Sequence, residues 1–197
     1  MRLIALTGTV AAGKSTVAAL FRQWGATVVD ADAVVRELQQ PGTPVFDAIV
    51  SRFGPDIVAA DGTLDRAALR QRILADPVAR RDLEAIVHPA VKLQRDAARD
   101  AARARGERVL IDDVPLLFEA ADPDRYDGII VVDAPEAERR RRLIDERGLS
   151  PDQADLLMAA QWPADAKRAR ATWIIDNAGD RDALQQRARQ VWQEIAP

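Results

Sequence analysis

The feature that most constrains the fold is a glycine-rich segment close to the N-terminus. Residues 8–16, GTVAAGKST, match the pattern G-x-x-x-x-G-K-[ST]. An apolar run at residues 3–6 precedes this segment, and a helical pattern over residues 14–24 follows it. In this strand–loop–helix context, backbone N–H groups can surround phosphate oxygens at the positive end of the helix. The segment therefore predicts a site for a nucleoside triphosphate.

Each position of the motif has a physical task. Gly8 and Gly13 permit backbone angles and close approach that a side chain would block. Lys14 brings a cation to the β- and γ-phosphates, and the hydroxyl group of Ser15 can ligate Mg²⁺. The expected triphosphate-binding residues of the segment are Gly8, Ala11, Ala12, Gly13, Lys14, Ser15 and Thr16.

Short β-branched and apolar runs recur along the chain and predict strands. They are bounded by Gly, Asp or Pro and are too short and too continuous for amphipathic helices. The expected strands are residues 3–6, 27–29, 109–112, 129–133 and 173–176, and the clearest helical patterns are residues 14–24, 136–147 and 182–195. Because strands alternate with helices, we expect an α/β fold with a parallel sheet covered on both faces.

With 197 residues, the chain is expected to form one domain with additions to its core. Residues 33–105 show no convincing strand but several helix signals, including Asp76 followed by Pro77; they predict a helical substrate subdomain. Residues 136–170 predict a helical lid, in which Ser150-Pro-Asp-Gln153 has the pattern of a capping box. The expected core is residues 1–32, 106–135 and 171–197.

Acidic residues follow two of the expected strands. Asp30 and Asp32 come after the second, where a carboxylate can accept the proton of an attacking hydroxyl group or hold water on Mg²⁺. Either residue alone could instead cap the next helix. Asp112 and Asp113 end the third strand, and because side chains alternate along a strand, only one of them should face the site.

An arginine-rich run at residues 139–142 lies within an expected helix. One interpretation is an exposed face paired with nearby acids. The other is that Arg142 or Arg147 reaches the transferred phosphoryl group. The single histidine, His88, stands before Pro89 in the helical stretch, where a structural role and a substrate contact are both open.

Composition excludes several classes of protein. The 28 basic and 31 acidic residues give a net charge of −3, which argues against an obligate nucleic-acid binder. There is no cysteine, and no apolar run approaches membrane-spanning length. We therefore expect a cytoplasmic enzyme with no membrane partner, and no obligate protein partner is evident.

Several short segments, in this order along the chain, are similar to one known family. They are Leu6-Thr7-Gly8, Asp30-Ala31-Asp32 with Arg36, Val87-His88-Pro89, DVPLLFE at residues 113–119, Arg142-Leu143 before Gly148-Leu149-Ser150, Gln161, and Ile175-Asp176-Asn177. In these the chain resembles the dephospho-CoA kinases, which use ATP to phosphorylate the ribose 3′-hydroxyl group of dephospho-CoA in the last step of coenzyme A biosynthesis. The resemblance spans nearly the whole chain.

The resemblance implies a fold like that of the nucleoside monophosphate kinases, ATP as phosphoryl donor, and Mg²⁺. It implies that Asp32 is the base, that Lys14 and Arg142 stabilise the transferred phosphoryl group, and that Asp113 lies with Ser15 near Mg²⁺. It also implies that Asp30, Arg36 and His88 contact dephospho-CoA and that Asn177 lies near the ATP base. The chain departs from the family's pattern at Thr9, Ala11, Glu146 and Thr172-Trp173.

Two rival functions account for parts of the sequence. A kinase for a sugar acid, a shikimate-like alcohol or a nucleoside monophosphate would use the same core, but the helical stretch at residues 33–105 is larger than a small acceptor needs. A nucleotide-dependent switch is disfavoured because no Asn-Lys-x-Asp segment occurs and Asp112-Asp113-Val114-Pro115 stands where D-x-x-G would be expected.

Overall fold

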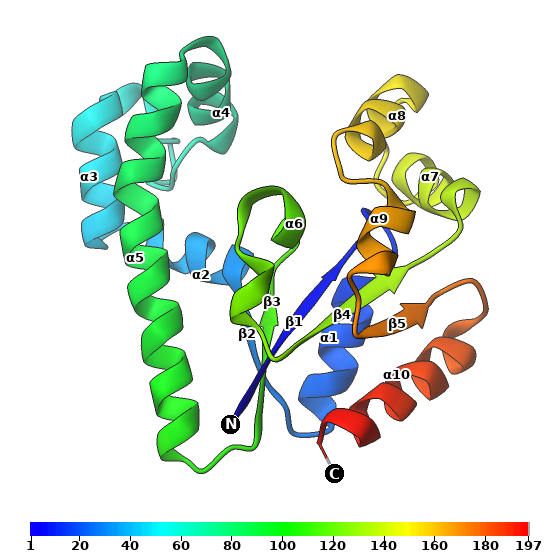
Figure 1. Cartoon of the computed structure of the whole chain (residues 1–197). Coiled ribbons are helices and arrows are strands. Elements are labelled where there is room, and N and C mark those ends of the chain that lie inside the picture. The colour runs from blue at the N-terminus through cyan, green and yellow to red at the C-terminus, as the bar shows by residue number, and fades with distance from the viewer. Residues whose placement is uncertain (197) are drawn as a thin grey trace. The chain divides into compact units, whose positions relative to one another are not determined.

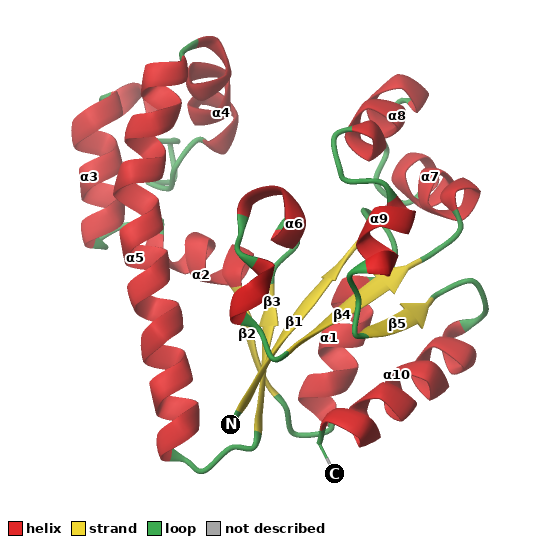
Figure 2. Ribbon diagram, in the orientation of Figure 1, coloured by secondary structure: helices red, strands yellow, loops and turns green. Residues whose placement is uncertain are grey.

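The computed structural model describes residues 1–196, apart from the side chain of Ala120. Within these residues a five-stranded sheet has the order β2-β3-β1-β4-β5 (Figure 2). Its strands are β1 (Arg2–Gly8), β2 (Thr27–Asp30), β3 (Val109–Asp113), β4 (Gly128–Asp133) and β5 (Trp173–Asp176). β1 pairs in parallel with β3 and with β4, and β4 pairs in parallel with β5. The expected α/β class and parallel sheet are confirmed, with each strand within two residues of its expected bounds.

The chain forms two compact units. Among the described residues, the first contains residues 1–29 and 102–196, and the second is Asp30–Ala101. The first holds most of the sheet together with α1 (Lys14–Gln23), α6 (Leu117–Ala120), α7 (Glu136–Asp145), α8 (Pro151–Ala159), α9 (Ala164–Ala169) and α10 (Arg181–Ile195) (Figure 1). The second holds α2 (Ala31–Leu38), α3 (Pro44–Phe53), α4 (Arg66–Ala75) and most of α5 (Pro77–Ala104).

Side-chain alternation along the strands gives the first unit a core on each face of the sheet. Ile130 and Val132 of β4 pack with Phe21 of α1 and with the buried face of α10. Their neighbours Ile129 and Val131 pack on the opposite face with Leu117 and Phe118. This two-residue period is what strands buried on both faces require.

The second unit has an apolar core of its own. Its centre is formed by Ile49 and Phe53 of α3, Ile57 of the turn at Pro55–Ile57, and Leu69 of α4. Within it, Asp76 accepts a hydrogen bond from the Val78 N–H group at 2.7 Å, so the expected start of α5 at Pro77 is confirmed. The helical stretch therefore folds around buried residues rather than serving as a plain connection between strands.

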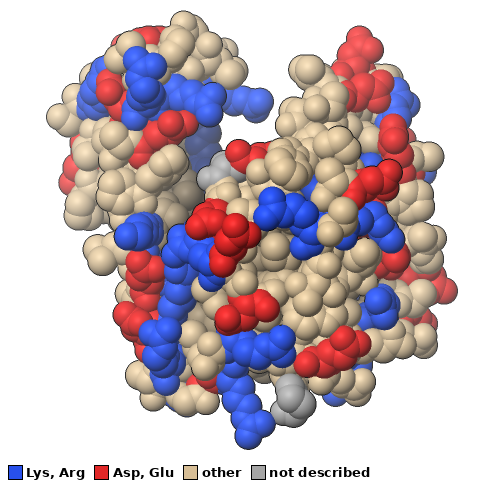
Figure 3. Space-filling view, in the orientation of Figure 1, with Lys and Arg blue, Asp and Glu red and all other residues tan. Residues whose placement is uncertain are grey.

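Figure 3 shows the charged side chains on one face of the molecule. On the face shown in Figure 3, acidic and basic residues are interspersed, in agreement with the near-balanced composition. None of the described helices is both long and apolar enough to cross a membrane.

The core of the first unit generates a stability prediction. Phe21→Ala removes a fully buried ring that also contacts Trp24 and Trp192, so the free energy of unfolding should fall by about 3–5 kcal/mol. The measurement is urea denaturation. Leu156→Ala, at a residue of α8 that is 74% exposed, is the control and should change the value by less than about 0.5 kcal/mol. Equal effects of the two variants would contradict the placement of the core.

Candidate active site

The glycine-rich segment forms a tight loop between β1 and α1, here called the phosphate loop (residues 8–15). A Cβ atom on Gly8 would lie 2.4 Å from the carbonyl oxygen of Val132, and one on Gly13 would lie 2.5 Å from Asn177 Nδ2. Gly13 also has a φ of 93°, a conformation that side chains disfavour. The expected need for glycine at both positions is confirmed.

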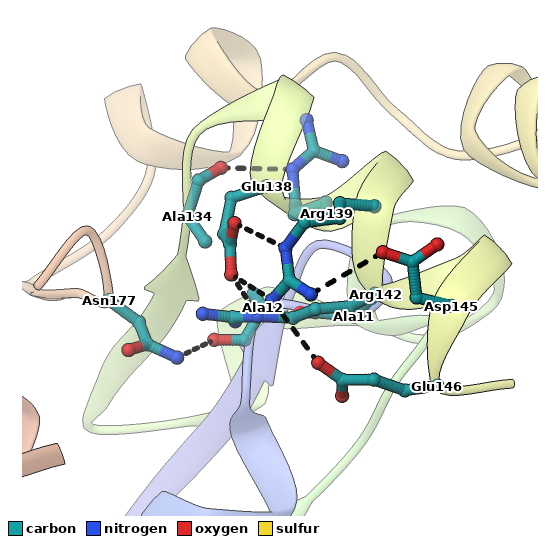
Figure 4. Close-up of polar contacts among 10 residues, drawn as sticks. Ala11, Ala12, Ala134, Glu138, Arg139, Arg142, Asp145, Glu146 and Asn177 are labelled. Atoms are coloured by element: carbon teal, nitrogen blue, oxygen red, sulfur yellow. Dashed lines mark hydrogen bonds and ion pairs between the residues drawn. The ribbon is translucent and has the colours of Figure 1, made fainter. Parts of the chain in front are cut away.

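Two side chains hold the carbonyl groups of the phosphate loop. Arg142 Nη1 donates to the Ala11 oxygen at 3.1 Å, and Asn177 Nδ2 donates to the Ala12 oxygen at 2.8 Å (Figure 4). The C=O and N–H groups of a trans peptide point in opposite directions, so fixing the Ala12 oxygen turns the Gly13 N–H group away from Asn177. The first N–H groups of α1 are without partners inside the helix. Together these donors form the arrangement that binds an anion at a helix N-terminus.

Lys14 at the start of α1 forms an ion pair with Asp113 at the end of β3. Asp112 points to the other side of the strand, where the hydroxyl group of Tyr126 donates to its Oδ2 at 2.9 Å. Of the two aspartates, Asp113 is therefore the one on the phosphate-loop side. The ion pair keeps the Lys14 ammonium group at the loop.

The donors available for Mg²⁺ are few. The described residues contain no cluster of three or more His, Cys, Asp or Glu side chains that could hold a metal ion alone. Mg²⁺ in phosphoryl-transfer sites takes one or two protein oxygens and fills its octahedron with phosphate and water. The hydroxyl group of Ser15, exposed in the first turn of α1, and the carboxylate of Asp113 are oxygen donors of that kind.

The arginine run of α7 divides between exposed and buried roles. Arg140 pairs with Asp155 at 2.6 Å, and Arg141 pairs with Glu138 at 2.8 Å, as expected for an exposed face. Arg139 is buried and donates to the Ala134 carbonyl oxygen at 3.0 Å, which corrects that interpretation for this residue. Its hydrogen bond is made to the segment that joins β4 to α7.

Arg142 is held in place by Glu138, which accepts its Nε–H at 3.0 Å. Hydrogen bonds from Arg141 and Arg142 lower the pKa of Glu138 to about 2, so this carboxylate is ionised at any physiological pH. Of the two arginines singled out by the sequence, Arg142 contacts the phosphate loop, whereas Arg147 lies beyond the end of α7 and is exposed.

A buried ion pair contacts the start of the phosphate loop at Gly8. Lys167 of α9 is fully buried and pairs with Glu119 at 2.8 Å, and its Nζ also lies 3.5 Å from the Gly8 oxygen. Burial acts to raise the pKa of Glu119, but hydrogen bonds from Lys167 and from the Trp162 N–H group outweigh it and lower the pKa. Sequence patterns do not reveal this pair, because its members are far apart in the chain. Glu119 ends the DVPLLFE segment at residues 113–119, but nothing local pairs that segment with Lys167.

The remaining residues singled out by the sequence belong to the second unit. Asp30 caps α2 by accepting the Ala33 N–H group at 2.9 Å. Asp32 lies in the first turn of α2 and Arg36 in its last turn, and both are exposed. His88 is also exposed, on α5 beside Pro89, which lies inside the helix. Of the two aspartates, Asp30 is thus the one that caps the helix.

The parallel sheet, the phosphate loop and the lysine fixed at that loop together define a P-loop nucleotide-binding protein of the kinase type. The family model described as dephospho-CoA kinase matches residues 2–182. The chain belongs to the dephospho-CoA kinase family.

Individual relatives agree with this assignment. A dephospho-CoA kinase of Symbiobacterium thermophilum is 47% identical over 98% of this chain and 80% of its own length. One of Corynebacterium diphtheriae is 42% identical over 100% of this chain and 98% of its own length. A crystal structure of a Thermus thermophilus protein superposes with a TM-score of 0.82 at 36% identity, covering 100% of this chain and 98% of that one.

The contact between Asn177 and the phosphate loop gives a second prediction. Asn177→Asp removes the donor to the Ala12 oxygen and sets a carboxylate against it, so the Kd for ATP should rise about tenfold or more. Isothermal titration calorimetry measures the change. Gln186→Glu, on the exposed surface of α10, adds the same charge away from the loop and should leave the Kd unaltered. An Asn177→Asp variant that binds ATP as tightly as the wild type would remove Asn177 from this role.

Proposed function

We propose that this chain transfers the γ-phosphoryl group of ATP to the ribose 3′-hydroxyl group of dephospho-CoA, giving coenzyme A and ADP. The observation that carries the proposal is the family match over residues 2–182 in a chain whose phosphate loop is complete. As a family member the chain is a kinase that uses a nucleotide. The assignment of residues to individual steps is our proposal.

ATP binding begins at the phosphate loop. N–H groups at the start of α1 bind the β- and γ-phosphate oxygens. The ammonium group of Lys14, which Asp113 holds at the loop, binds the same oxygens through its positive charge. Ser15 and Asp113 would hold Mg²⁺ with the phosphates; the ion supplies charge neutralisation for the transferred group. Because these groups are in place beforehand, little ordering remains to be done when ATP binds.

Arg142 is proposed to stabilise the phosphoryl group during transfer. Glu138 fixes one side of its guanidinium group and the Ala11 oxygen accepts from Nη1, so the cation is held at the edge of the phosphate loop. A positioned arginine of this kind contributes on the order of 10³–10⁵ in rate in related chemistry. Residues 136–170 would act as the lid, which closes over the nucleotide and excludes water.

Asp32 is proposed as the base that accepts the proton of the 3′-hydroxyl group. Since Asp30 provides the cap of α2, the Asp32 carboxylate is left for another task, and it is exposed in the first helical turn. Asp30, Arg36 and His88 belong to the same unit and are proposed to contact dephospho-CoA. The helices of this unit would then supply the acceptor site.

The direct test compares acceptors. Release of ADP from ATP and Mg²⁺ is measured with dephospho-CoA, adenosine, shikimate, gluconate and nucleoside monophosphates, and each product is identified by its mass. We expect phosphorylation of dephospho-CoA alone. Phosphorylation of a different acceptor would overturn the assignment of the acceptor while leaving the phosphate loop's role intact.

Replacement of the base should separate chemistry from binding. Asp32→Asn should lower kcat by about 10²- to 10⁴-fold, because the amide cannot accept the proton, while the Kd for ATP stays within about twofold. Asp47→Asn is the matched control: Asp47 is an exposed aspartate in the first turn of α3 in the same unit, and its loss should leave kcat unchanged. Full turnover by Asp32→Asn would exclude Asp32 as the base.

Replacement of Lys14 in the phosphate loop should affect both the Kd for ATP and kcat. Lys14→Ala removes a charge-assisted contact to the phosphates, so the Kd for ATP should rise about 10- to 100-fold and kcat should fall as well. The change also removes the Lys14 ion pair of the buried Asp113 carboxylate, so the thermal midpoint is measured in parallel. Lys92→Ala, at an exposed lysine of α5, should match the wild type. Unimpaired ATP binding by a folded Lys14→Ala variant would contradict the site.

A further inference from the structure

The second residue of the phosphate loop, Thr9, is anchored by all of its polar groups. Its N–H group donates to the Val132 oxygen at 3.2 Å, and its own oxygen accepts the Ala12 N–H group at 3.1 Å. Its hydroxyl group donates to Asp133 Oδ1 at 2.8 Å. Thr9 is 5% exposed, so these bonds are largely shielded from water. Both the backbone and the side chain of this residue tie the loop to the end of β4.

Asp133 also belongs to a series of side-chain hydrogen bonds that extends beyond Thr9. Its other carboxylate oxygen accepts from Arg168 Nη1 at 3.2 Å, and the same nitrogen donates to Asp176 Oδ1 at 2.5 Å. Asp133 ends β4, Asp176 ends β5, and Arg168 lies on α9. The four residues Thr9, Asp133, Arg168 and Asp176, here called the Thr9 lock, join the phosphate loop to two strand ends and to α9.

The Thr9 lock contacts the phosphate loop at Ala12, directly before Gly13. The Thr9 oxygen binds the Ala12 N–H group, and the oxygen of Ala12 is held by Asn177. Thr9 therefore holds the Ala11–Ala12 peptide, and Asn177 holds the Ala12–Gly13 peptide that follows it, whose N–H group is turned away from Asn177. A residue with no side-chain anchor here would leave that peptide freer, and the freedom would have to be lost when ATP binds.

We propose that Thr9 is a positioning residue for ATP: through its hydrogen bond to Asp133, the Thr9 lock holds the phosphate loop in its phosphate-binding shape before the nucleotide arrives. The inference rests on the proposed function only in taking ATP as the ligand. It does not depend on which acceptor is phosphorylated.

The test compares three variants of Thr9 in the full-length enzyme. Thr9→Val keeps the shape of the side chain but puts a methyl group where the hydroxyl group was. Thr9→Ala removes the hydroxyl group and puts nothing in its place. Thr9→Ser keeps the hydroxyl group. The Kd for ATP is measured by calorimetry in magnesium buffer without acceptor, and KM and kcat are measured with dephospho-CoA. We expect Thr9→Val and Thr9→Ala to raise the Kd and the KM for ATP about five- to tenfold, with kcat within about twofold. For Thr9→Ser, the Kd for ATP, the KM for ATP and kcat should each stay within about twofold of the wild-type values.

The matched control is Thr172→Val. The Thr172 hydroxyl group accepts the Ile129 N–H group at 3.0 Å, at the opposite end of β4 and β5 from the phosphate loop. This variant should lower the thermal midpoint while leaving the Kd for ATP unchanged, which separates a loss of stability from a loss of positioning.

Two results would overturn the proposal. One is an unchanged Kd for ATP in Thr9→Val and Thr9→Ala, even if both melt earlier, because the residue would then be structural only. The other is an equal loss of affinity in Thr9→Ser, because the hydroxyl group would then not be the cause. Failure of the wild-type enzyme to phosphorylate dephospho-CoA would count against the proposed function, and the binding measurements would still decide the role of Thr9.

Discussion

The backbone at the end of the phosphate loop and the start of α1 must present N–H groups to an anion, and the side-chain contacts around the loop serve that requirement. In this conformation the carbonyl oxygens of the loop point away from the anion. Because buried carbonyl groups need hydrogen-bond donors, these oxygens require partners elsewhere in the protein. Here the partners are side chains that lie far away in the sequence: Arg142 binds the Ala11 oxygen and Asn177 binds the Ala12 oxygen. Gln161 holds the loop at a third point by accepting the Val10 N–H group at 2.7 Å. The loop is thus shaped from outside by segments that follow β4 and β5.

The parallel sheet makes this arrangement possible. Strands β1 and β4 are neighbours, and β4 lies between β1 and β5, so the ends of three strands meet at the loop. Residues just past those ends can reach a single backbone segment although more than a hundred positions separate them along the chain. Rigid strands place such residues more accurately than loops do, so the side chains that hold the phosphate loop are themselves well positioned.

Local patterns predict much of this fold. The strands, the helix that starts at Lys14, the capping box at Ser150 and the start of α5 at Pro77 all depend on nearby residues, and the structure confirms them. The choice between Asp112 and Asp113 required only the alternation of a strand together with the resemblance. The phosphate loop itself is recognisable because its residue types are forced by backbone geometry.

Contacts between distant segments could not be predicted in the same way. Nothing in the sequence near Thr9 indicates that its hydroxyl group meets Asp133, and nothing near Lys167 indicates that it is buried against Glu119. The resemblance implies that Asn177 lies near the ATP base, but the hydrogen bond to the Ala12 oxygen depends on the folded positions of β5 and the loop. Pairings of this kind arise from tertiary structure, and a single sequence carries no local pattern for them.

We expect the phosphate loop to be ordered already in the free enzyme. Nitrogen-15 relaxation of the backbone, measured without nucleotide, tests it most directly. Order parameters for residues 9–13 should be about 0.85, the value of rigid backbone, as in the flanking β1 and α1. Values below about 0.6 that rise only when ATP is added would show that the nucleotide, and not the surrounding side chains, shapes the loop.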